Sequence, residues 1–311
     1  MDKMALIEML KGLKRRVYIW RDQEEYKKRS RMNPKDYPEK LAQIYKQITG
    51  EELNLEHPCT YNEKIQWSKL YDTDPRKTVL SDKYAVRSWV REKIGDEYLV
   101  PLLGTWDRFD DIDFSKLPSQ FVLKLNNGSA TNIVVTDKSK LDLHLAKKKF
   151  KEWTKTNFAF RGFELQYKDI KPKIIAEEYL IADGLEDLPD YKFFCFDGKV
   201  FCSYTMKDYT MCHENGRLGF FDRDYKLMPY YRRDFKPILQ QIPKPKNYEK
   251  MLELAECLAK GFPHVRVDFY DLDGKIYFGE MTFTNSSGYC KFEPEEFNRI
   301  LGDQWTLPAQ R

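Results

Sequence analysis

Two acidic residues lie in an otherwise apolar hairpin, where a core would favour uncharged side chains. Asp268 and Glu280 both belong to HVRVDFYDLDGKIYFGEMTF, residues 264–283. A two-residue turn would place Asp268 opposite Gly279, whereas a three-residue loop over residues 273–275 would place it opposite Glu280. We favour the three-residue loop because it puts both carboxylates on one face, with Cβ atoms about 5 Å apart. Two like charges this close repel each other unless a cation lies between them.

A magnesium ion is one cation that suits this pair. Mg²⁺ takes oxygen ligands, usually one or two carboxylates together with nucleotide phosphates. A salt bridge from Arg266 or a nearby lysine is the alternative, and these residues alone favour neither. Strand alternation places Arg266 on the face of Asp268. On the second strand it predicts one face for Phe278, Glu280 and Thr282.

A second candidate site begins with a lysine in an apolar strand. Lys124 lies in FVLKLNNGSATNIVV, residues 121–135. The loop that follows it is built from short side chains: Asn127, Gly128, Ser129, Ala130 and Thr131. Such residues let backbone N–H groups approach an anion, so the segment suits a flap over phosphates. An ordinary hairpin with a snorkelling lysine has the same pattern.

Acidic residues also end a β-prone run, KIIAEEYL, residues 173–180. Glu177 and Glu178 close this run, and Asp183 follows shortly after. Such a strand end can receive a purine edge through backbone hydrogen bonds and ribose hydroxyls through a carboxylate. A strand that ends in solvent is the plainer alternative. The next hairpin, DYKFFCFDGKVFCSY, carries Lys192 among aromatic residues.

The order of these features suits a nucleotide site. The two lysines and the flap would hold phosphates, the acidic strand end would hold adenosine, and the carboxylate pair would hold the metal. The four histidines are scattered, and we assign them no role. The sequence shows no convincing Ser-His-Asp or Cys-His set.

The elements that position these residues fall into a helical and a strand-rich part. Residues 36–95 have helical periodicity, with one helix ending at Gly50. Thr60 and Glu63 predict a capping box at the start of the next helix, and a third helix follows Ser81.

Short β-branched or aromatic runs follow this helical part, and we predict them as strands. They are YLVPLLGTW, FVLKL, NIVVT, KIIAEEYL, YKFFCF, KVFCSYT, VRVDFY and KIYFGEMTF. Helical stretches at residues 141–154 and 248–258 interrupt them. This mixture predicts an α+β protein with several hairpins.

Composition and charge indicate a globular cytosolic protein. Hydrophobic residues make up 41% and charged residues 33% of the 311 residues, which excludes a disordered chain. The six cysteines have no regular spacing and read as the buried thiols of a reducing cytosol.

The net charge is +4, of which residues 1–40 carry +5. A basic amphipathic helix there would either lie on the inner face of an anionic membrane or pack on its own domain. The nearly neutral remainder has no basic stripe and argues against nucleic acid as a partner.

The chain resembles the TupA-like ATP-grasp family, which is named for teichuronopeptide synthesis and found among surface-polysaccharide genes. The matching phrases lie between residues 38 and 289 and include TYNEKIQWSKLYD, LSDKYAVRSWV, FVLKLNNGSATNIVV, IKPKIIAEEYL, DYKFFCFDGKV and RVDFYDLDGKIYFGEMTF. The resemblance implies an ATP-grasp fold, in which two α/β subdomains hold ATP between them. We expect a helical region over residues 1–95, a lid subdomain over 96–183 and a core subdomain with the metal site over 184–311.

The resemblance also implies the cofactors ATP and Mg²⁺ and a role for each candidate residue. Lys124 and Lys192 would touch phosphates, and the 127–131 loop would cover them. The adenine pocket would be lined by Glu177, Glu178, Tyr179 and Leu180. Asp183 would bind ribose, and Asp268 and Glu280 would hold Mg²⁺.

One position departs from the common ATP-grasp pattern, in which an Asn lies two residues after the metal-binding Glu. Here Thr282 takes that place, and Asn285 is a second candidate ligand. Arg266 and Lys192 are our candidates for steadying the transferring phosphoryl group, with orientation of Asp268 as the alternative role of Arg266.

The reaction implied is an ATP-dependent carboxylate–amine ligation through an acyl phosphate. The acid would be a nucleotide- or lipid-linked sugar uronate, and the amine an amino acid or amino alcohol, in capsular or other surface-polysaccharide synthesis. A phosphotransferase acting on a sugar hydroxyl and a partner protein with a degenerate nucleotide site are the alternatives. Residues around Lys83 and Arg87, or His213, Arg217 and Arg232, are candidates for the acceptor site.

Overall fold

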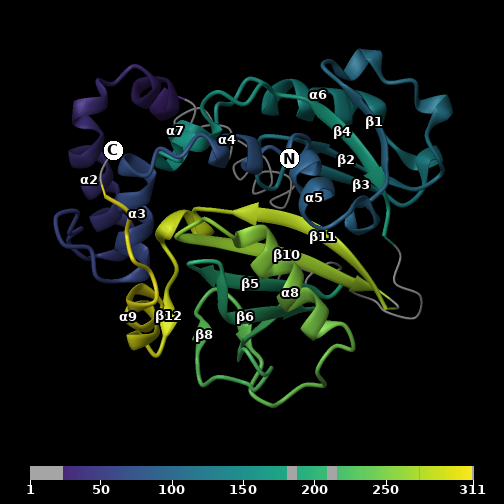
Figure 1. The fold of residues 1–311 in the computed structure, drawn as a ribbon. Helices are drawn as coiled ribbons and strands as arrows, with labels where there is room; N and C mark the ends of the chain where they lie inside the picture. The colour runs from purple at the N-terminus through teal and green to yellow at the C-terminus, as the bar shows by residue number, and fades with distance from the viewer. Residues whose placement is uncertain (1–23, 181–187, 209–215, 273, 310–311) are drawn as a thin grey trace, which may run out of the picture.

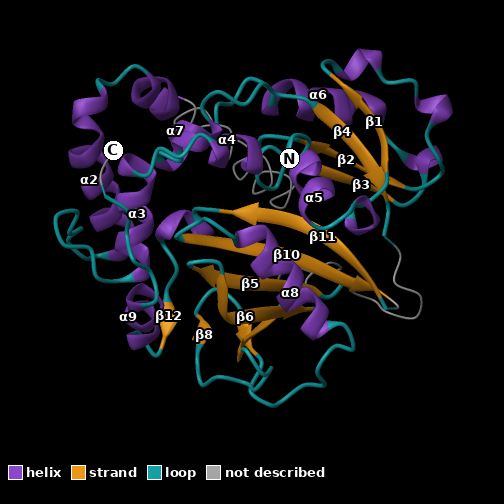
Figure 2. Ribbon diagram, viewed as in Figure 1, coloured by secondary structure: helices purple, strands orange, loops and turns teal. Residues whose placement is uncertain are grey.

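Two β-sheets lie one above the other, with helices packed around them (Figure 1). The structure is a computed structural model that describes residues 24–180, 188–208, 216–272 and 274–309. The predicted N-terminal amphipathic helix, Asp183 and His213 lie outside the described residues. Figure 2 shows strands and helices mixed in both halves of the molecule, so the predicted α+β class is confirmed.

The upper sheet has four strands in the order β1-β4-β2-β3. These are β1 (Leu102–Trp106), β2 (Phe121–Leu125), β3 (Asn132–Val135) and β4 (Ile174–Glu178). All three pairings are antiparallel. Helix α6 (Leu143–Trp153) lies along this sheet (Figure 1), and its Phe150 joins the core formed by Phe121 and Leu123.

The lower sheet has six strands in the order β11-β10-β5-β6-β7-β9. These are β5 (Asp190–Phe196), β6 (Lys199–Lys207), β7 (Arg217–Asp222), β9 (Lys236–Pro237), β10 (His264–Leu272) and β11 (Lys275–Thr282). A small second ladder pairs β8 (Tyr231–Arg232) with β12 (Phe292–Glu293). The edge strand β11 lies nearest the upper sheet (Figure 1). Residues near β11 are therefore the ones that can meet the upper sheet.

Different helices cover the two faces of the lower sheet. On one face, Phe193 and Val267 pack in a buried core with α8 (Tyr248–Ala259). On the other face, Phe194 and Tyr204 pack with α3 (Tyr61–Tyr71) and α9 (Glu296–Asp303). Strand alternation places the side chain of Arg266, which is opposite Phe194, on this second face.

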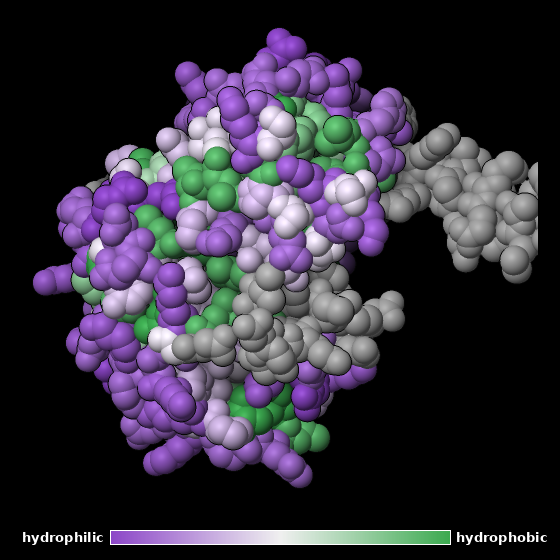
Figure 3. All heavy atoms as spheres, turned by 90° about the vertical axis from the view of Figure 1, so that its right-hand side faces the viewer, coloured by the Kyte–Doolittle hydropathy of each residue, from purple (hydrophilic) through white to green (hydrophobic). Residues whose placement is uncertain are grey.

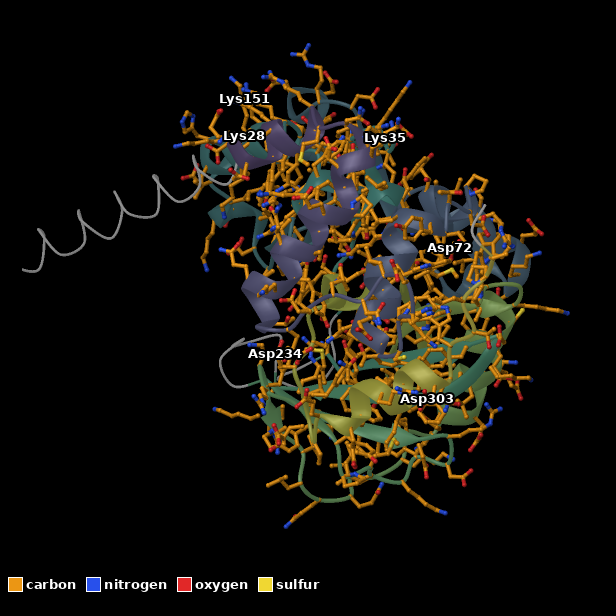
Figure 4. The ribbon with its side chains drawn as sticks, turned by 90° about the vertical axis from the view of Figure 1, so that its left-hand side faces the viewer. Lys28, Lys35, Asp72, Lys151, Asp234 and Asp303 are labelled. Carbon is orange, nitrogen blue, oxygen red and sulfur yellow. The ribbon has the colours of Figure 1, made fainter. Side chains whose placement is uncertain are left out.

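The remaining helices pack on the left of the molecule in Figure 1 or between the sheets. They include α2 (Tyr37–Thr49), α4 (Arg76–Ser81), α5 (Val86–Lys93) and α7 (Ala159–Gly162). None of the described helices is both long enough and apolar enough to cross a membrane. In Figure 4 the labelled Lys28, Lys35 and Lys151 lie on the upper part, and Asp234 and Asp303 on the lower part.

The helix boundaries confirm the predicted caps. The Gly50 N–H donates to the Lys46 carbonyl at 2.9 Å, and its φ of 85° is one that glycine adopts without strain. The Thr60 hydroxyl accepts from the Glu63 N–H, while the Glu63 carboxylate accepts from the Thr60 N–H at 2.8 Å.

Some elements were not predicted from the sequence. Helix α4, which ends at Ser81, was not predicted. The helix expected after Ser81 is α5, which begins at Val86. Helices α7 and α9 and strands β7, β8, β9 and β12 were not predicted either. Most of these are short, and their burial depends on neighbours far away in the sequence, so they have little local pattern.

The hairpin of β10 and β11 confirms the pairing of Asp268 with Glu280 but not the reason given for it. Leu272 pairs with Lys275, so the connection has two residues, and the three-residue loop was wrong. The register shifts between Asp268 and Phe269, which is the mark of a β-bulge. The extra residue is Gly279, and a Cβ there would lie 3.1 Å from the Asp268 carbonyl oxygen.

The bulge also corrects a second prediction. Phe278 does not share a face with Glu280, because the bulge turns the strand over by one residue. Phe278 instead pairs with Phe269 and packs in the core beneath α8. Glu280 and Thr282 remain on the face that carries Arg266, since Asp268 pairs with Glu280 and Arg266 with Thr282. The extra residue Gly279 therefore determines which side chains of β11 lie on the face of Arg266.

Candidate functional site

Arg266 is the centre of a buried charge cluster on β10 and β11. Its guanidinium donates two hydrogen bonds to Asp268, from Nε to Oδ1 and from Nη2 to Oδ2, both at 2.7 Å. Nη2 also donates to Glu280 Oε1 at 2.7 Å and to Thr282 Oγ1 at 3.1 Å. Nη1 donates to Asn285 Oδ1, at the start of the short helix η8 (Asn285–Gly288). One side chain thus holds the four residues that the sequence predicted as metal ligands.

Lys192 extends this cluster onto β5. Strand pairing places Lys192 directly opposite Asp268. Its ammonium lies 2.6 Å from Asp268 Oδ2 and 2.5 Å from Asp190 Oδ2. Asp190 was not predicted, although its position two residues before Lys192 on the same strand face was a readable signal.

The charges in this cluster shift one another's pKa. Burial disfavours the charged guanidinium, but Asp268 and Glu280 outweigh it and raise the pKa of Arg266 well above its usual value. Burial likewise disfavours the charge of Lys192, and Asp190 and Asp268 together raise the pKa of Lys192. Both cations therefore stay charged at any physiological pH.

The two outer acids of the cluster shift in opposite directions. Burial opposes ionisation of Glu280, but Arg266, Lys192 and Lys83 outweigh it and lower the pKa of Glu280 to about 2. Burial raises the pKa of Asp190 to about 6, against the pull of Lys192 and with the help of the charge on Asp268. Glu280 is thus the firmly ionised carboxylate, and its side chain is also 41% exposed.

The donor set of this cluster fits a magnesium ion only in part. Among the residues that the structure describes, no group of three or more His, Cys, Asp and Glu side chains is placed to hold a metal. Asp268 and Glu280 do offer hard oxygen ligands on paired positions. The bonds found leave Glu280 Oε2 and one lone pair of Asp268 Oδ1 without a partner in the described part of the chain. Mg²⁺ held there would need phosphate oxygens or water to complete its coordination.

Thr282 and Asn285, predicted as metal ligands, are directed toward Arg266. Thr282 Oγ1 accepts from Arg266 and donates to Glu280 Oε1 at 2.9 Å. Asn285 is fully buried and accepts from Arg266 through Oδ1. In this arrangement both residues position the guanidinium, and their role toward a metal stays a prediction.

The upper sheet carries a second charge cluster around Glu177 on β4. Lys124 on β2 donates to Glu177 Oε2 at 2.7 Å, and Arg87 on α5 donates to Oε1 at 3.2 Å. Arg87 also donates to the Val100 carbonyl at 2.9 Å. Glu177 is therefore shared between the two cations, and a phosphate ligand of Lys124 would compete with it.

The loop after β2 contains two buried polar atoms that make no hydrogen bond in the described structure. Asn127 Oδ1 and Thr131 Oγ1 are buried and have no hydrogen-bond partner among the described residues. A Cβ at Gly128 would lie 2.6 Å from Thr131 Oγ1, so only glycine leaves this loop its present shape. Ser129 and Ala130 are exposed, and Ala130 has a φ of 55°. An exposed, strained tip over an unpaired hydroxyl is consistent with a loop that accepts an anion.

The predicted adenine-binding residues lie at the end of β4. Glu178 is exposed, and its backbone N–H donates to the Pro101 carbonyl at 3.0 Å. Tyr179 and Leu180 follow directly and are half-buried. Their role toward adenine stays a prediction.

The acceptor candidates Arg217 on β7 and Arg232 on β8 are already paired with acids. Arg217 is half exposed and donates to Asp208 at 2.6 Å. Arg232 is buried and donates to Asp234 at 2.5 and 3.0 Å. Its guanidinium lies 6.0 Å from the ring of Tyr204, which also faces Arg266. Arg232 is thus the candidate nearer the charge cluster.

A histidine close to the site is locked in its neutral form. His264 Nδ1 donates to the Cys195 carbonyl at 2.9 Å, which leaves Nε2 to accept from the Tyr61 hydroxyl at 2.9 Å. Burial lowers the pKa of His264 to about 3. Burial also raises the pKa of the Cys195 and Cys202 thiols. These residues offer neither a proton shuttle nor a nucleophile at neutral pH.

An open groove lies away from both charge clusters. It has a volume of about 340 Å³ and lies between β3 and α6, with Val134 and Leu145 in its lining. Figure 3 shows apolar patches among hydrophilic side chains on the side of the molecule that includes the upper sheet. No predicted site residue lines this groove.

Comparison with known proteins identifies a family. The sequence model of the TupA-like ATP-grasp family matches residues 63–306. No curated protein matches the sequence.

Solved structures that resemble the chain include several ATP-grasp ligases and synthetases. D-alanine–D-alanine ligase from Bacillus anthracis, complexed with ATP, has 16% identity and a TM-score of 0.37, and the match covers 66% of this chain and 54% of that chain. N5-carboxyaminoimidazole synthetase from Staphylococcus aureus, complexed with ADP, has 12% identity and a TM-score of 0.39, with 74% and 53% covered. The ATP-grasp ligase PsnB, complexed with Mg and ADP, has 10% identity and a TM-score of 0.38, with 74% and 58% covered. The chain thus spans little more than half the length of these proteins.

Proposed function

Because the chain belongs to the TupA-like ATP-grasp family, and is therefore an ATP-grasp enzyme, we propose that it is an ATP- and Mg²⁺-dependent carboxylate–amine ligase. The acid would be the uronate of a nucleotide- or lipid-linked sugar, and the amine an amino acid or amino alcohol. The predicted ATP-grasp fold is confirmed by the family match. The choice of substrates rests on the family's place among surface-polysaccharide genes.

The observation that carries this proposal is the cluster around Arg266. Two cations whose charge is secured by their neighbours, Arg266 and Lys192, lie next to a carboxylate pair in a largely buried position. Phosphoryl transfer needs this kind of environment, since catalysis depends on positioning and on neutralising the phosphoryl oxygens. Mg²⁺ bound at Asp268 and Glu280 would add a further positive charge there.

The residues of the charge cluster would have separate roles in the reaction. Lys192 and Arg266 hold positive charge where the transferring phosphoryl group develops negative charge. Thr282 and Asn285 keep the Arg266 guanidinium in place through their hydrogen bonds. Closure of the site over ATP would exclude water and so protect an acyl phosphate until the amine attacks its carbonyl carbon and releases phosphate.

The neutral, buried His264 supports a mechanism without a covalent protein intermediate. A histidine with a pKa of about 3 does not act as a general base at neutral pH. The same holds for the buried thiols of Cys195 and Cys202 as nucleophiles. The acyl phosphate route requires neither.

Hydroxylamine trapping tests this function. The protein is incubated with Mg-ATP, hydroxylamine and a panel of uronates that includes UDP-glucuronate, and ADP and hydroxamate are measured. ATP-dependent hydroxamate would support the ligase and name the acid. ADP together with a phosphorylated sugar, and no hydroxamate, would make the enzyme a phosphotransferase instead.

One variant tests the assigned site in that assay, and a second variant serves as its control. Asp268→Asn keeps the shape of the side chain but removes a charge from the cluster, so product should fall at least about tenfold if Asp268 holds the metal. Lys226→Gln removes an exposed lysine whose nearest acid, Asp224, is 3.9 Å away, so it should behave as the wild type. Equal hydroxamate from wild type and Asp268→Asn would contradict the assigned site.

A further inference from the structure

Helix α3 buries a row of polar side chains, which we call the α3 polar stripe. Asn62, Gln66 and Lys69 lie on one face of the helix and are 3%, 0% and 4% exposed. A helix normally turns such side chains toward solvent, because a buried polar group costs free energy unless it is hydrogen-bonded. Asn62 Nδ2 donates to the Cys290 carbonyl at 2.7 Å, and the other two residues bind the turn just before Cys290.

Gln66 and Lys69 hold the turn η8 by its backbone carbonyls. Gln66 Nε2 donates to the Ser287 carbonyl at 3.0 Å and to the Gly288 carbonyl at 2.8 Å. The Lys69 ammonium donates to the Ser287 carbonyl at 2.8 Å and to the Ser287 hydroxyl at 2.9 Å. Its third donor goes to Gln66 Oε1 at 2.8 Å, so all three N–H groups of the ammonium are used.

The backbone of this turn has a conformation that needs support. Ser286, Ser287 and Gly288 have φ angles of 47°, 53° and 69°. Glycine adopts a positive φ without strain, whereas a residue with a Cβ does so at a cost in free energy. Two successive serines persist in this conformation only where the surrounding structure holds them. Gln66 and Lys69 supply that support, since both donate to the carbonyl between the second serine and the glycine.

Lys69 is a costly residue for this task, because its charge has no ion-pair partner in the described part of the chain. Glu164 acts on Lys69 through its field alone, and the ring of Tyr289 lies 4.9 Å from the ammonium. Burial lowers the pKa of Lys69 to about 8, with Glu164 opposing this effect. A buried ion whose bonds to the backbone all go to one turn indicates a role in placing that turn.

The turn begins with a residue of the charge cluster. Asn285, the first residue of η8, is fully buried and accepts from Arg266 Nη1. Asn285 Nδ2 lies 3.5 Å from the sulfur of Cys290, whose carbonyl is the one that Asn62 holds. The segment that carries Asn285 is therefore fixed by β11 at its start and by the α3 polar stripe at its end.

We propose that the α3 polar stripe, and Lys69 above all, positions Arg266 by holding the turn η8 and with it Asn285. Lys69 is a positioning residue, since its hydrogen bonds go to Gln66 and Ser287 and not to the charge cluster. The helical region thereby takes part in the site although it lies far from β10 in the sequence. The inference concerns the geometry of the cluster, so it holds for a ligase and for a phosphotransferase.

The Nε–H group of Arg266 reports on this arrangement. In protein that carries isotope-labelled arginine, this group gives an NMR signal of its own. Its 2.7 Å bond to Asp268 Oδ1 in a buried position protects it from exchange with water. The signal is assigned by its loss in Arg266→Lys. Its exchange rate is then measured in the wild type, in Lys69→Met and in Gln66→Met.

Lys64→Met is the matched control for these variants. Lys64 lies on the same helix, and its ammonium also donates to two backbone carbonyls, those of Gly302 at 2.8 Å and Trp305 at 2.6 Å. Its replacement removes the same kind of bond without touching η8. Melting temperatures of all variants are measured as well, so that a general loss of stability is distinguished from a local loss of order at Arg266.

If the α3 polar stripe positions Arg266, Lys69→Met raises the exchange rate of the Arg266 Nε–H group at least about tenfold above that of Lys64→Met. Gln66→Met changes the rate in the same direction, which keeps the proposal testable if Lys69→Met does not fold. Asn285→Ala removes the link between the turn and Arg266. Adding Lys69→Met to Asn285→Ala should therefore change the rate no further.

Two results overturn the proposal. Equal exchange rates in Lys69→Met, Gln66→Met and Lys64→Met at comparable melting temperatures would show that the stripe only stabilises the fold. Additive effects of Lys69→Met and Asn285→Ala would show that Lys69 does not act through Asn285. Both measurements use the protein without nucleotide, so their outcome is independent of the proposed function.

Discussion

Replacing Arg266 by methionine should destabilise the protein far more than replacing an exposed arginine. Methionine has a similar length but no charge and no donors. Arg266 is 6% exposed, and its two 2.7 Å bonds to Asp268 neutralise a carboxylate that is only 1% exposed. Loss of the guanidinium leaves Asp268 buried with Lys192 as its one remaining cation among the described residues.

The expected size follows from this burial. Removing one partner of a buried ion pair costs about 3–5 kcal/mol, because the other charge stays buried without compensation. With about 2–4 °C per kcal/mol for large domains, the melting temperature should fall by about 6–20 °C. Arg223→Met is the matched control, since Arg223 is half exposed and paired with Glu256. Such surface pairs contribute about 0–1 kcal/mol.

Thermal unfolding followed by circular dichroism measures both variants. The double variant Arg266→Met/Asp268→Asn should recover part of the loss, because it removes the charge that Arg266 compensates, with a coupling of about 0.5–3 kcal/mol. If Arg266→Met lowers the melting temperature no more than Arg223→Met does, the buried ion cluster is not present as described. Additive effects in the double variant would refute the direct pairing of Arg266 with Asp268.

Three further predictions concern the bulge, the buried histidine and the capping box. Gly279→Ala should weaken Mg-ATP binding about tenfold, because its Cβ would lie 3.1 Å from the Asp268 carbonyl and push Asp268 away; unchanged calorimetric affinity would contradict this. His264 has a folded pKa lowered to about 3, so its contribution to stability is complete above the unfolded pKa of about 6.5 and is lost as pH falls from there toward 3, by about 1.4 kcal/mol per pH unit. His264→Asn should flatten urea-unfolding stability over that window, and an unchanged slope would show that His264 is protonated in the fold. Thr60→Ala should cost about 1 kcal/mol and a few degrees of melting temperature through loss of the capping box, whereas no loss would mean that the helix end is held otherwise.

Much of the site was predictable because its signals are local. Alternation along β10 placed Arg266 and Asp268 on one face correctly, since a strand alternates its side chains whatever it packs against. The same alternation predicts that Asp190, two residues before Lys192, lies on the face of Lys192. Phe278 was assigned to the wrong face because alternation fails at a bulge, and this bulge is visible only in the strand register of the folded hairpin.

Contacts between distant segments had no comparable signal. Glu177 is held by Lys124 and by Arg87, which is 90 residues away in the sequence. Nothing in either segment predicts the other, because the pairing depends on how α5 packs against the upper sheet. The same applies to Lys83 and the Gly128 carbonyl.

The sequence by itself determined the caps at Gly50 and Thr60, the strands that carry the site, and the family, whereas the bulge of the folded hairpin set the pairing of Asp268 with Glu280. These depend on residue types at short spacings, where backbone geometry allows few alternatives. The tertiary structure alone decided that Arg266 gathers the predicted metal ligands and that Lys83 binds the Gly128 carbonyl. Those outcomes depend on which buried charges the fold brings within a few ångströms of one another, because a buried charge costs free energy unless it is paired.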